Sequence, residues 1–326
     1  MATVMSAGPI VRPVGPGAFL VEHDGRSDIV YAAGHGAERW LFWNGHVFHT
    51  GPSTPSTSGT SGTSRTPGTP GTSGTPRTSL GKELDTSHGA VVAVSADLPN
   101  RGQATGTLVG DRVVLTAGHV SPVPSDDLPP WAVTFGANAN EAAKRIRLNA
   151  ATGSRPHPLF LSFVETFGRN PGERPDFLDV GLLVLPESAA GVTPATLPEP
   201  GALDRITPAD RFLGVGYGYS EIIPENNAGP PSPSDGKRRR WRTGVKILNE
   251  AWIRLDDDPA KGYGQLCRGD SGAPIFMERL GREVLVGVVS HSDGQGCGPG
   301  IPTYAVRVDN PAVLNWIREE AGKRAD

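Results

Sequence analysis

One serine in the chain has neighbours that suit nucleophilic chemistry. Ser271 lies in CRGDSGAPIF, residues 267–276, between two glycines and directly after an aspartate. Acyl transfer by a serine needs a base that takes its proton, an acid that holds the base, and amides that face the developing oxyanion. Gly269 has no Cβ to obstruct a backbone N–H that points at substrate, and Gly272 permits a sharp turn. We therefore predict that the amides of Gly269 and Ser271 form an oxyanion hole.

The candidate base is His119, in RVVLTAGHV. It follows an apolar strand and small residues, so we expect its imidazole to emerge from a rigid core into a cleft. Two carboxylates in ERPDFLDVGLLVL are available as the orienting acid. Asp176 follows Arg-Pro in a polar loop, whereas Asp179 directly precedes an apolar strand against which it would be buried. We therefore assign the acid to Asp179 and keep Asp176 as the alternative.

The segments that must position these residues are mostly short strands. Gly (43) and Pro (31) are abundant, and strand-like runs recur between turn signals through the second half of the chain. Because no helical periodicity separates these runs, they predict antiparallel barrels or a sandwich rather than a parallel sheet. One helix is expected at the end of the chain, begun by Asn310 and Pro311. Its buried face would consist of Val313, Leu314 and Ile317.

Taken together, these stretches resemble the chymotrypsin/trypsin-like serine endopeptidases. The resemblance rests on LTAGHV, DVGLLVL, GDSGAP, GVVSH and YAVRV in this order, and it covers about residues 88–321. It implies a mostly β fold of two antiparallel six-stranded β-barrels with a C-terminal helix. It also implies that His119 is the base, Asp179 the orienting acid and Ser271 the nucleophile, with protein or peptide substrates and without a metal or cofactor.

The resemblance also assigns roles around the specificity pocket. Cys267 and Cys297 match the half-cystines that brace this pocket in the family, so we expect them to pair. Gln265 stands where an aspartate would select Arg or Lys, so this position does not support trypsin specificity. Ser290 and Ser292 would belong to the same pocket.

Two departures from the family pattern concern how the site is held together. The family's common disulfide near the base is missing at both partners, because Ala104 and Val120 stand where its cysteines would be. The loop of the base would then be braced by packing alone. The zymogen-type N-terminus, usually Ile-Val-Gly-Gly, is also missing before HGAVVAV, so its usual partner, here Asp270, needs another group. The other possibility is activation near one of three residues: Arg77, Lys82 or His88.

The chain ahead of these motifs divides into two further parts. Residues 51–79 consist almost wholly of Gly, Ser, Thr and Pro, which have no apolar surface to offset ordering and predict a disordered linker. Residues 1–50 indicate a small β-module of unknown role, in which Asn44-Gly45 is a hairpin signal. A protease domain would fill residues 80–326. The module's four histidines show no spacing typical of a metal site: His23, His35, His46 and His49.

Charge and hydropathy exclude several kinds of partner. The net charge of the 326 residues is −3, which gives no global field for nucleic acid, and no apolar run is long enough to span a bilayer. The basic run 237–240, with Trp241, is interpreted as the tip of an exposed loop, more suited to self-cleavage than to nucleic acid. The N-terminus lacks the pattern of a secretory signal, whereas the family and the cysteine pair favour secretion.

Three hypotheses about function follow. The first is a serine endopeptidase that works through an acyl-enzyme. The second is a catalytically silent protease homologue that acts as a binding or scaffolding module. The third gives the main role to the N-terminal module, which would bind an unknown partner. An α/β-hydrolase is rejected because Ala273 occupies the last glycine position of G-x-S-x-G, and because His and Asp precede Ser along this chain.

Overall fold

The computed structural model describes most of the second part of the chain and isolated strands of the first. The described residues are 80–96, 103–121, 131–140, 145–161, 178–223, 234–293 and 297–322, with the backbone of five strands between residues 10 and 49. The chain forms two compact units, Met1–Arg77 and Thr78–Asp326. The expected linker at 51–79 and the alternative acid Asp176 lie outside the described residues.

The first unit contains two small antiparallel sheets. Its strands are β1 (Ile10–Gly15), β2 (Ala18–His23), β3 (Arg26–Tyr31), β4 (Trp40–Trp43) and β5 (His46–His49). The first three form one sheet in the order β1-β2-β3, and β4 pairs with β5. Trp43 lies opposite His46, which is the register that a two-residue Asn44-Gly45 turn predicts. The side chains of this unit, including its histidines, lie outside the described residues.

The second unit begins with a curled antiparallel sheet of seven strands. These are β7 (Val91–Ala96), β8 (Gln103–Gly110), β9 (Val113–Thr116), β10 (Trp131–Thr134), β11 (Arg145–Leu148), β12 (Ser154–Pro156) and β13 (Gly181–Val184). Their order is β11-β10-β7-β8-β9-β13-β12, and among the described strands no pairing joins β11 to β12. The short helix α1 (Ala150–Gly153) precedes β12.

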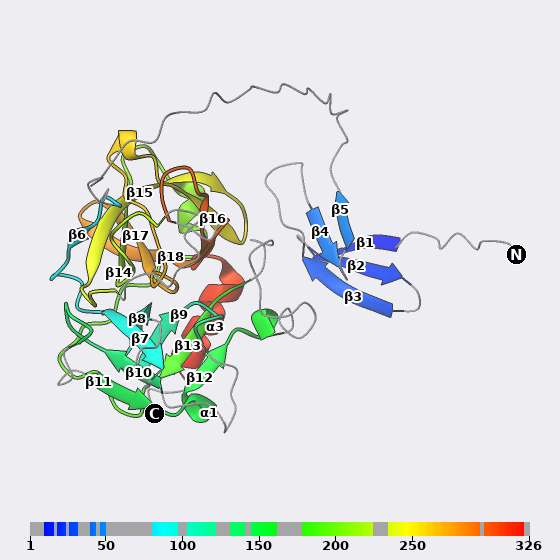
Figure 1. The fold of residues 1–326 in the computed structure, drawn as a ribbon. Helices are drawn as coiled ribbons and strands as arrows, with labels where there is room; N and C mark the ends of the chain where they lie inside the picture. The colour runs from blue at the N-terminus through cyan, green and yellow to red at the C-terminus, as the bar shows by residue number, and fades with distance from the viewer. Residues whose placement is uncertain are drawn as a thin grey trace, which may run out of the picture. The chain divides into compact units, whose positions relative to one another are not determined.

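The remaining strands build a closed barrel. They are β14 (Arg211–Gly216), β15 (Arg239–Leu248), β16 (Trp252–Asp256), β17 (Pro274–Arg279), β18 (Arg282–Ser292) and β19 (Thr303–Arg307). Pairing of β14 with both β17 and β15 closes the ring of six, and the short β6 (Glu83–Leu84) adds to the far edge of β15 (Figure 1). Two 3₁₀ turns, η2 (Ala202–Arg205) and η3 (Pro259–Lys261), lie in the connections. The predicted fold class, two antiparallel β-barrels, is confirmed.

The apolar strand runs of the sequence are buried on both faces because the two barrels pack against each other. In β9, Val114 points into the core of the curled sheet, whereas Val113 and Leu115 belong to the core that both barrels share. In β13, Leu183 likewise belongs to the core of the curled sheet and Leu182 to the core that both barrels share. Successive strand side chains point to opposite faces, so a strand between two cores reads as a continuous apolar run.

The helix predicted at the end of the chain is confirmed as α3 (Pro311–Gly322), drawn in red in Figure 1. The side chain of Asn310 accepts a hydrogen bond from the amide of Ala312 (2.9 Å), which caps the first turn. The predicted face of Val313, Leu314 and Ile317 is fully buried in the core between the barrels. None of the helices in the described residues has the length and apolar character needed to cross a membrane.

Candidate active site

Strand pairing explains how His119 and Asp179 meet although 60 residues separate them. In the β9–β13 pair, Thr116 at the end of β9 lies opposite Gly181 at the start of β13. The chain that leaves β9 and the chain that enters β13 therefore lie at the same end of the sheet. His119 follows Thr116 by three residues and Asp179 precedes Gly181 by two.

The two side chains are joined by hydrogen bonds. Asp179 Oδ2 lies 2.8 Å from His119 Nδ1, and Oδ1 accepts a bond from the backbone N–H of His119, also at 2.8 Å. An ionised carboxylate only accepts hydrogen bonds, so the proton of the neutral ring is on Nδ1 and the lone pair is on Nε2. The Asp179 side chain is 1% exposed and that of His119 is 30% exposed. The carboxylate of Asp179 is therefore buried behind an imidazole that solvent reaches.

The surroundings set the protonation of both groups. Burial by itself would lower the pKa of His119, but the charge and hydrogen bond of Asp179 outweigh it and raise the pKa above its ordinary value. Burial would likewise raise the pKa of Asp179, yet the His119 charge and the hydrogen bonds from His119 and Ser290 hold it below its ordinary value. The pair favours an ionised acid beside an imidazole of increased basicity.

Strand pairing in the second barrel likewise places Ser271 at the boundary between the two barrels, which we call the seam. Pro274 at the start of β17 lies opposite Val288 in β18, so the residues before β17 and after Val288 share one end of the barrel. The amide of Gly272 donates to the carbonyl of Val289 (2.8 Å), which continues this pairing toward Ser271. Ser290, two residues beyond Val288, lies at the same end.

Several hydrogen bonds cross from one barrel to the other at this point. The hydroxyl of Ser290 donates to Asp179 Oδ2 (2.6 Å), and the amide of Thr105 in β8 donates to the carbonyl of Ser271 (2.9 Å). The Thr105 hydroxyl donates to the carbonyl of Gly269 (2.9 Å). Within the described residues, the Ser271 hydroxyl makes no hydrogen bond to the His119 ring. The backbone of the serine loop is thus fixed against β8, while the Ser271 hydroxyl makes no hydrogen bond to any residue in the described part of the chain.

Both glycines around Ser271 adopt a backbone conformation that requires them. Gly269 has φ +95° and Gly272 has φ +81°, values that residues with a Cβ rarely adopt. A Cβ at Gly272 would lie 2.2 Å from the carbonyl oxygen of Thr105, and one at Gly269 would lie 2.9 Å from Gly218 Cα. In this loop, the amides of Gly269 and Ser271 donate to no acceptor within the described residues. These are the two N–H groups predicted to form the oxyanion hole.

The cysteine pair and the residues around it are close to their expected places. Cys267 and Cys297 form a disulfide with a Cα–Cα distance of 5.1 Å, as predicted. Gln265 is 4% exposed, and its side-chain amide donates to the carbonyl of Asp257 (3.2 Å). Ser290 and Ser292 both lie in β18, and the Ser290 hydroxyl donates a hydrogen bond to Asp179. Sequence reasoning missed this contact because nothing local indicates where a serine hydroxyl points.

Packing replaces the missing disulfide near the base. Val120 is 6% exposed in the core of the curled sheet, and the partly buried Ala104 packs against the same cluster. Two amides, of Val120 and Ser121, donate to the carbonyl of Ala117 and close the turn that carries His119. Apolar contact and backbone hydrogen bonds therefore hold this loop.

The interpretation of the basic run as an exposed loop tip is wrong. Arg238 is 2% exposed and donates to Asp85 (2.8 Å), and Arg239 and Arg240 lie in β15 beside Asp235 and Glu83. Trp241 is 2% exposed. Two of these carboxylates, Asp85 and Glu83, are distant in the sequence, so local sequence patterns do not reveal them, whereas Asp235 lies four residues before Arg239.

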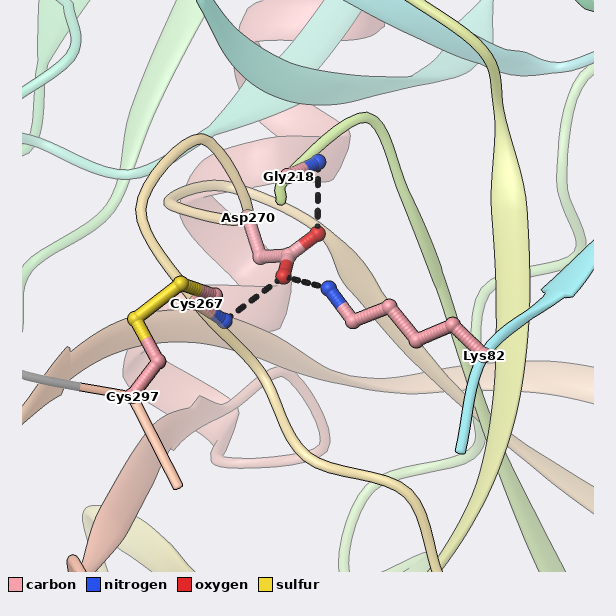
Figure 2. Close-up of a disulfide and its surroundings, with 5 residues drawn as sticks. All are labelled: Lys82, Gly218, Cys267, Asp270 and Cys297. Atoms are coloured by element: carbon pink, nitrogen blue, oxygen red, sulfur yellow. Dashed lines mark hydrogen bonds and ion pairs between the residues drawn. A yellow bond between two sulfur atoms is a disulfide. The ribbon is translucent and has the colours of Figure 1, made fainter. Parts of the chain in front are cut away.

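Two further features complete the site. Asp270 is fully buried, and its partner is the side chain of Lys82 (Figure 2). The sequence alone indicates Lys82 only as one of three residues near a possible activation site, because no local pattern links it to an aspartate 188 residues away. Within the described residues, no group of three His, Cys, Asp or Glu side chains gathers in a way that would hold a metal ion.

Comparisons with known proteins agree with this architecture. The family model described as Trypsin matches residues 83–317. The chain is similar to cercarial protease of Schistosoma mansoni, with 27% identity over 230 residues that cover 67% of this chain and 80% of that protein. It is also similar to spermosin of Halocynthia roretzi, with 26% identity over 216 residues that cover 65% of this chain. The match spans 52% of spermosin's length.

Proposed function

Because this chain belongs to the trypsin family, we propose that it is a serine endopeptidase that hydrolyses peptide bonds in proteins through an acyl-enzyme. The observation that carries the proposal is the buried carboxylate of Asp179, which binds both His119 and Ser290 at the seam of the two barrels. A buried charge is costly unless it is paired and hydrogen-bonded, and this one is directed at the ring that a serine nucleophile needs. The amides of Gly269 and Ser271, which have no acceptor within the described residues, would supply the donors of the oxyanion hole.

In the first half of the proposed reaction, Ser271 Oγ attacks the carbonyl carbon of the scissile peptide bond. Its proton passes to His119 Nε2, whose lone pair is available because Nδ1–H donates to Asp179. The carbonyl oxygen takes the negative charge and accepts hydrogen bonds from the amides of Gly269 and Ser271. The imidazolium then gives its proton to the leaving amine, and the C–N bond breaks.

The second half repeats these roles with water. A water molecule gives its proton to His119 Nε2 and attacks the ester carbon of the acyl-enzyme. The same two amides stabilise the second oxyanion, and the imidazolium returns the proton to Ser271 Oγ as the C–O bond breaks. The carboxylate of Asp179 stabilises the imidazolium in both halves and remains ionised throughout.

A fluorophosphonate tests the nucleophile directly. We expect one equivalent of label on Ser271, and no label on the Ser271→Ala variant. Ser188→Ala is a matched control, because Ser188 is exposed on the first barrel and should leave labelling unchanged. Digestion of casein by the same preparations reports turnover. A folded wild-type protein that neither takes the label nor cleaves casein would refute the proposal.

The alternative is a silent protease homologue that binds proteins without cutting them. The observation in its favour is that the Ser271 hydroxyl and the His119 ring make no hydrogen bond within the described residues. Catalytic hydrogen bonds are often long in proteases without substrate and tighten on binding. Retained binding of casein without labelling or cleavage would support this alternative.

A further inference from the structure

Asp270 is a buried charge that the proposed reaction does not use. Its carboxylate is fully buried. Oδ1 accepts a hydrogen bond from the amide of Gly218 (2.9 Å) and Oδ2 accepts one from the amide of Cys267 (2.8 Å). A Cβ at Gly216 or Gly218 would lie 2.4 Å from the atoms of this carboxylate, so it packs directly on the backbone of two glycines. Such a charge needs a cation, because an unpaired buried carboxylate costs several kcal/mol.

The cation is the ammonium group of Lys82. Figure 2 shows the Lys82 side chain extending from the segment just before β6 to Asp270 Oδ2, beside the Cys267–Cys297 disulfide. The Lys82 side chain is also fully buried, and its nitrogen lies 4.7 Å from the centre of the Trp241 ring. The other charge whose field reaches it belongs to Arg239, which Asp235 neutralises at 2.7 Å. Asp270 is therefore the one direct ionic partner of Lys82 among the described residues.

The backbone on both sides of Lys82 is bound to the second barrel. We call residues 80–85 the strap. At its start, the amide of Leu80 donates to Ser220 (3.0 Å) and its carbonyl accepts from Gln265 (2.9 Å). In its middle, β6 pairs with β15. At its end, the fully buried carboxylate of Asp85 accepts from the guanidinium of Arg238 (2.8 Å). The strap thus holds the ammonium in place as part of a continuous chain.

We propose that Lys82 is a positioning residue that builds the oxyanion hole in the uncut chain. The inference rests on the proposed function. Asp270 lies between Gly269 and Ser271, so the Ser271 amide belongs to the peptide group that directly follows Asp270, and the Gly269 amide lies one residue ahead of it in the same tight loop. Its carboxylate fixes Cys267 and Gly218, and its own amide donates to the carbonyl of Cys267 (3.0 Å). The direction of both amides therefore depends on Asp270 staying inward.

Asp270 could be neutralised either by a new α-amino group, which requires cleavage of the chain, or by a lysine side chain, which does not. A charge that neutralises Asp270 from a lysine side chain needs no new α-amino group, so the pair forms as soon as the strap folds onto β15. The matched family model begins at residue 83, one residue after Lys82. Lys82 therefore lies just outside the residues that the family model matches.

Removal of the ammonium tests the proposal. In Lys82→Met the apolar stem remains and the charge is lost, so Asp270 must take up a proton or turn toward water. Both changes release the Gly269–Ser271 loop, and losing oxyanion donors lowers kcat by about 10²- to 10³-fold with little change in KM. Lys261→Met is the matched control, because Lys261 pairs with Asp256 at 2.6 Å but is 55% exposed. This control should keep wild-type kcat.

A second variant separates positioning from folding. Lys82→Ala leaves space beside Asp270, and ethylammonium chloride should restore part of kcat, whereas sodium chloride of equal ionic strength should not. A folded Lys82→Met variant with wild-type kcat overturns the proposal.

The wild-type full-length chain gives an independent answer if both variants fail to fold. Mass spectrometry of fluorophosphonate-labelled protein should find label on molecules that retain residues 1–82. Label confined to molecules cut upstream of the protease domain would overturn the inference while leaving the proposed activity intact. A wild-type protein that takes no label in either form would instead refute the proposed function.

Discussion

Replacing Asp179 by asparagine keeps the shape of the side chain almost unchanged but removes its negative charge. Oδ1 of Asp179 accepts a hydrogen bond from the backbone N–H of His119, so the side-chain oxygen of the asparagine should keep that position. The NH₂ group would then face His119 Nδ1 and the Ser290 hydroxyl. An amide N–H can only donate, so Nδ1 must accept and the ring proton moves to Nε2. In that tautomer the ring cannot take the proton of Ser271.

The expected loss is large because it combines a wrong tautomer with the loss of a buried charge. The corresponding change in the Ser-His-Asp template lowers kcat by about 10⁴-fold, which is about 5 kcal/mol of transition-state stabilisation. The pH profile should move as well. Asp179 is what raises the pKa of His119 against the effect of burial, so in Asp179→Asn this pKa should fall below its ordinary 6.5. The acid limb of the remaining activity should move to lower pH.

The assay is kcat and kcat/KM for an ester substrate between pH 5 and 9, with folding checked by near-UV circular dichroism. Asp309→Asn is the matched control, since Asp309 is equally buried but binds Arg307 and the amide of Leu203 instead of His119. It should lower the melting temperature and leave kcat unchanged. An Asp179→Asn variant with wild-type kcat, or with an acid limb at the wild-type pH, would refute the assignment of the acid.

Three further predictions concern the serine loop and its supports. Burial lowers the pKa of Lys82 below 10.5, although Asp270 opposes the shift, so kcat should fall on the alkaline side at a pH below 10.5 as the ammonium loses its proton; a flat alkaline profile up to that pH would contradict this. Reduction of the disulfide between Cys267 and Cys297, which have a sequence separation of 30, should lower the free energy of unfolding by about 3–4 kcal/mol in urea titrations. Gly272→Ala should abolish labelling and destabilise the fold by more than about 1 kcal/mol, because its backbone has φ +81°; the urea midpoint measures this.

The contact between His119 and Asp179 could be predicted because each residue adjoins an apolar run that is recognisable as a strand. Each residue adjoins an apolar strand, and antiparallel pairing of β9 with β13 brings the two strand ends together. The choice of Asp179 over Asp176 rested on the same reasoning about burial, and Asp179 is 1% exposed. The α3 helix was predictable for a similar reason, since its cap and its apolar face lie within one short segment.

The contacts that sequence reasoning missed all join distant parts of the chain. Lys82 and Asp270 are 188 residues apart, and a lysine after a glycine has no local signature of burial. Arg238 and Arg240 resemble parts of a solvated basic tip until Asp85 and Glu83, which are distant in the sequence, are placed beside them. Ion pairs carry no periodicity, so they become visible only once the sheet order is known.

The two sets of strands differ in how firmly they hold their halves of the candidate site. The second barrel is a closed ring, whereas the first sheet ends, within the described strands, at β11 and β12. The edge strands of an open sheet lose their hydrogen bonds more readily than the strands of a closed barrel. The edge strand β12 pairs directly with β13, which begins two residues after Asp179, so this opening would reach the backbone beside Asp179. Deuterium should therefore enter the backbone around the acid earlier than the backbone of β17 and β18. Under the proposed function, Ser271 would then lie on the more rigid barrel, whereas His119 and Asp179 would lie on the sheet whose edges open more often.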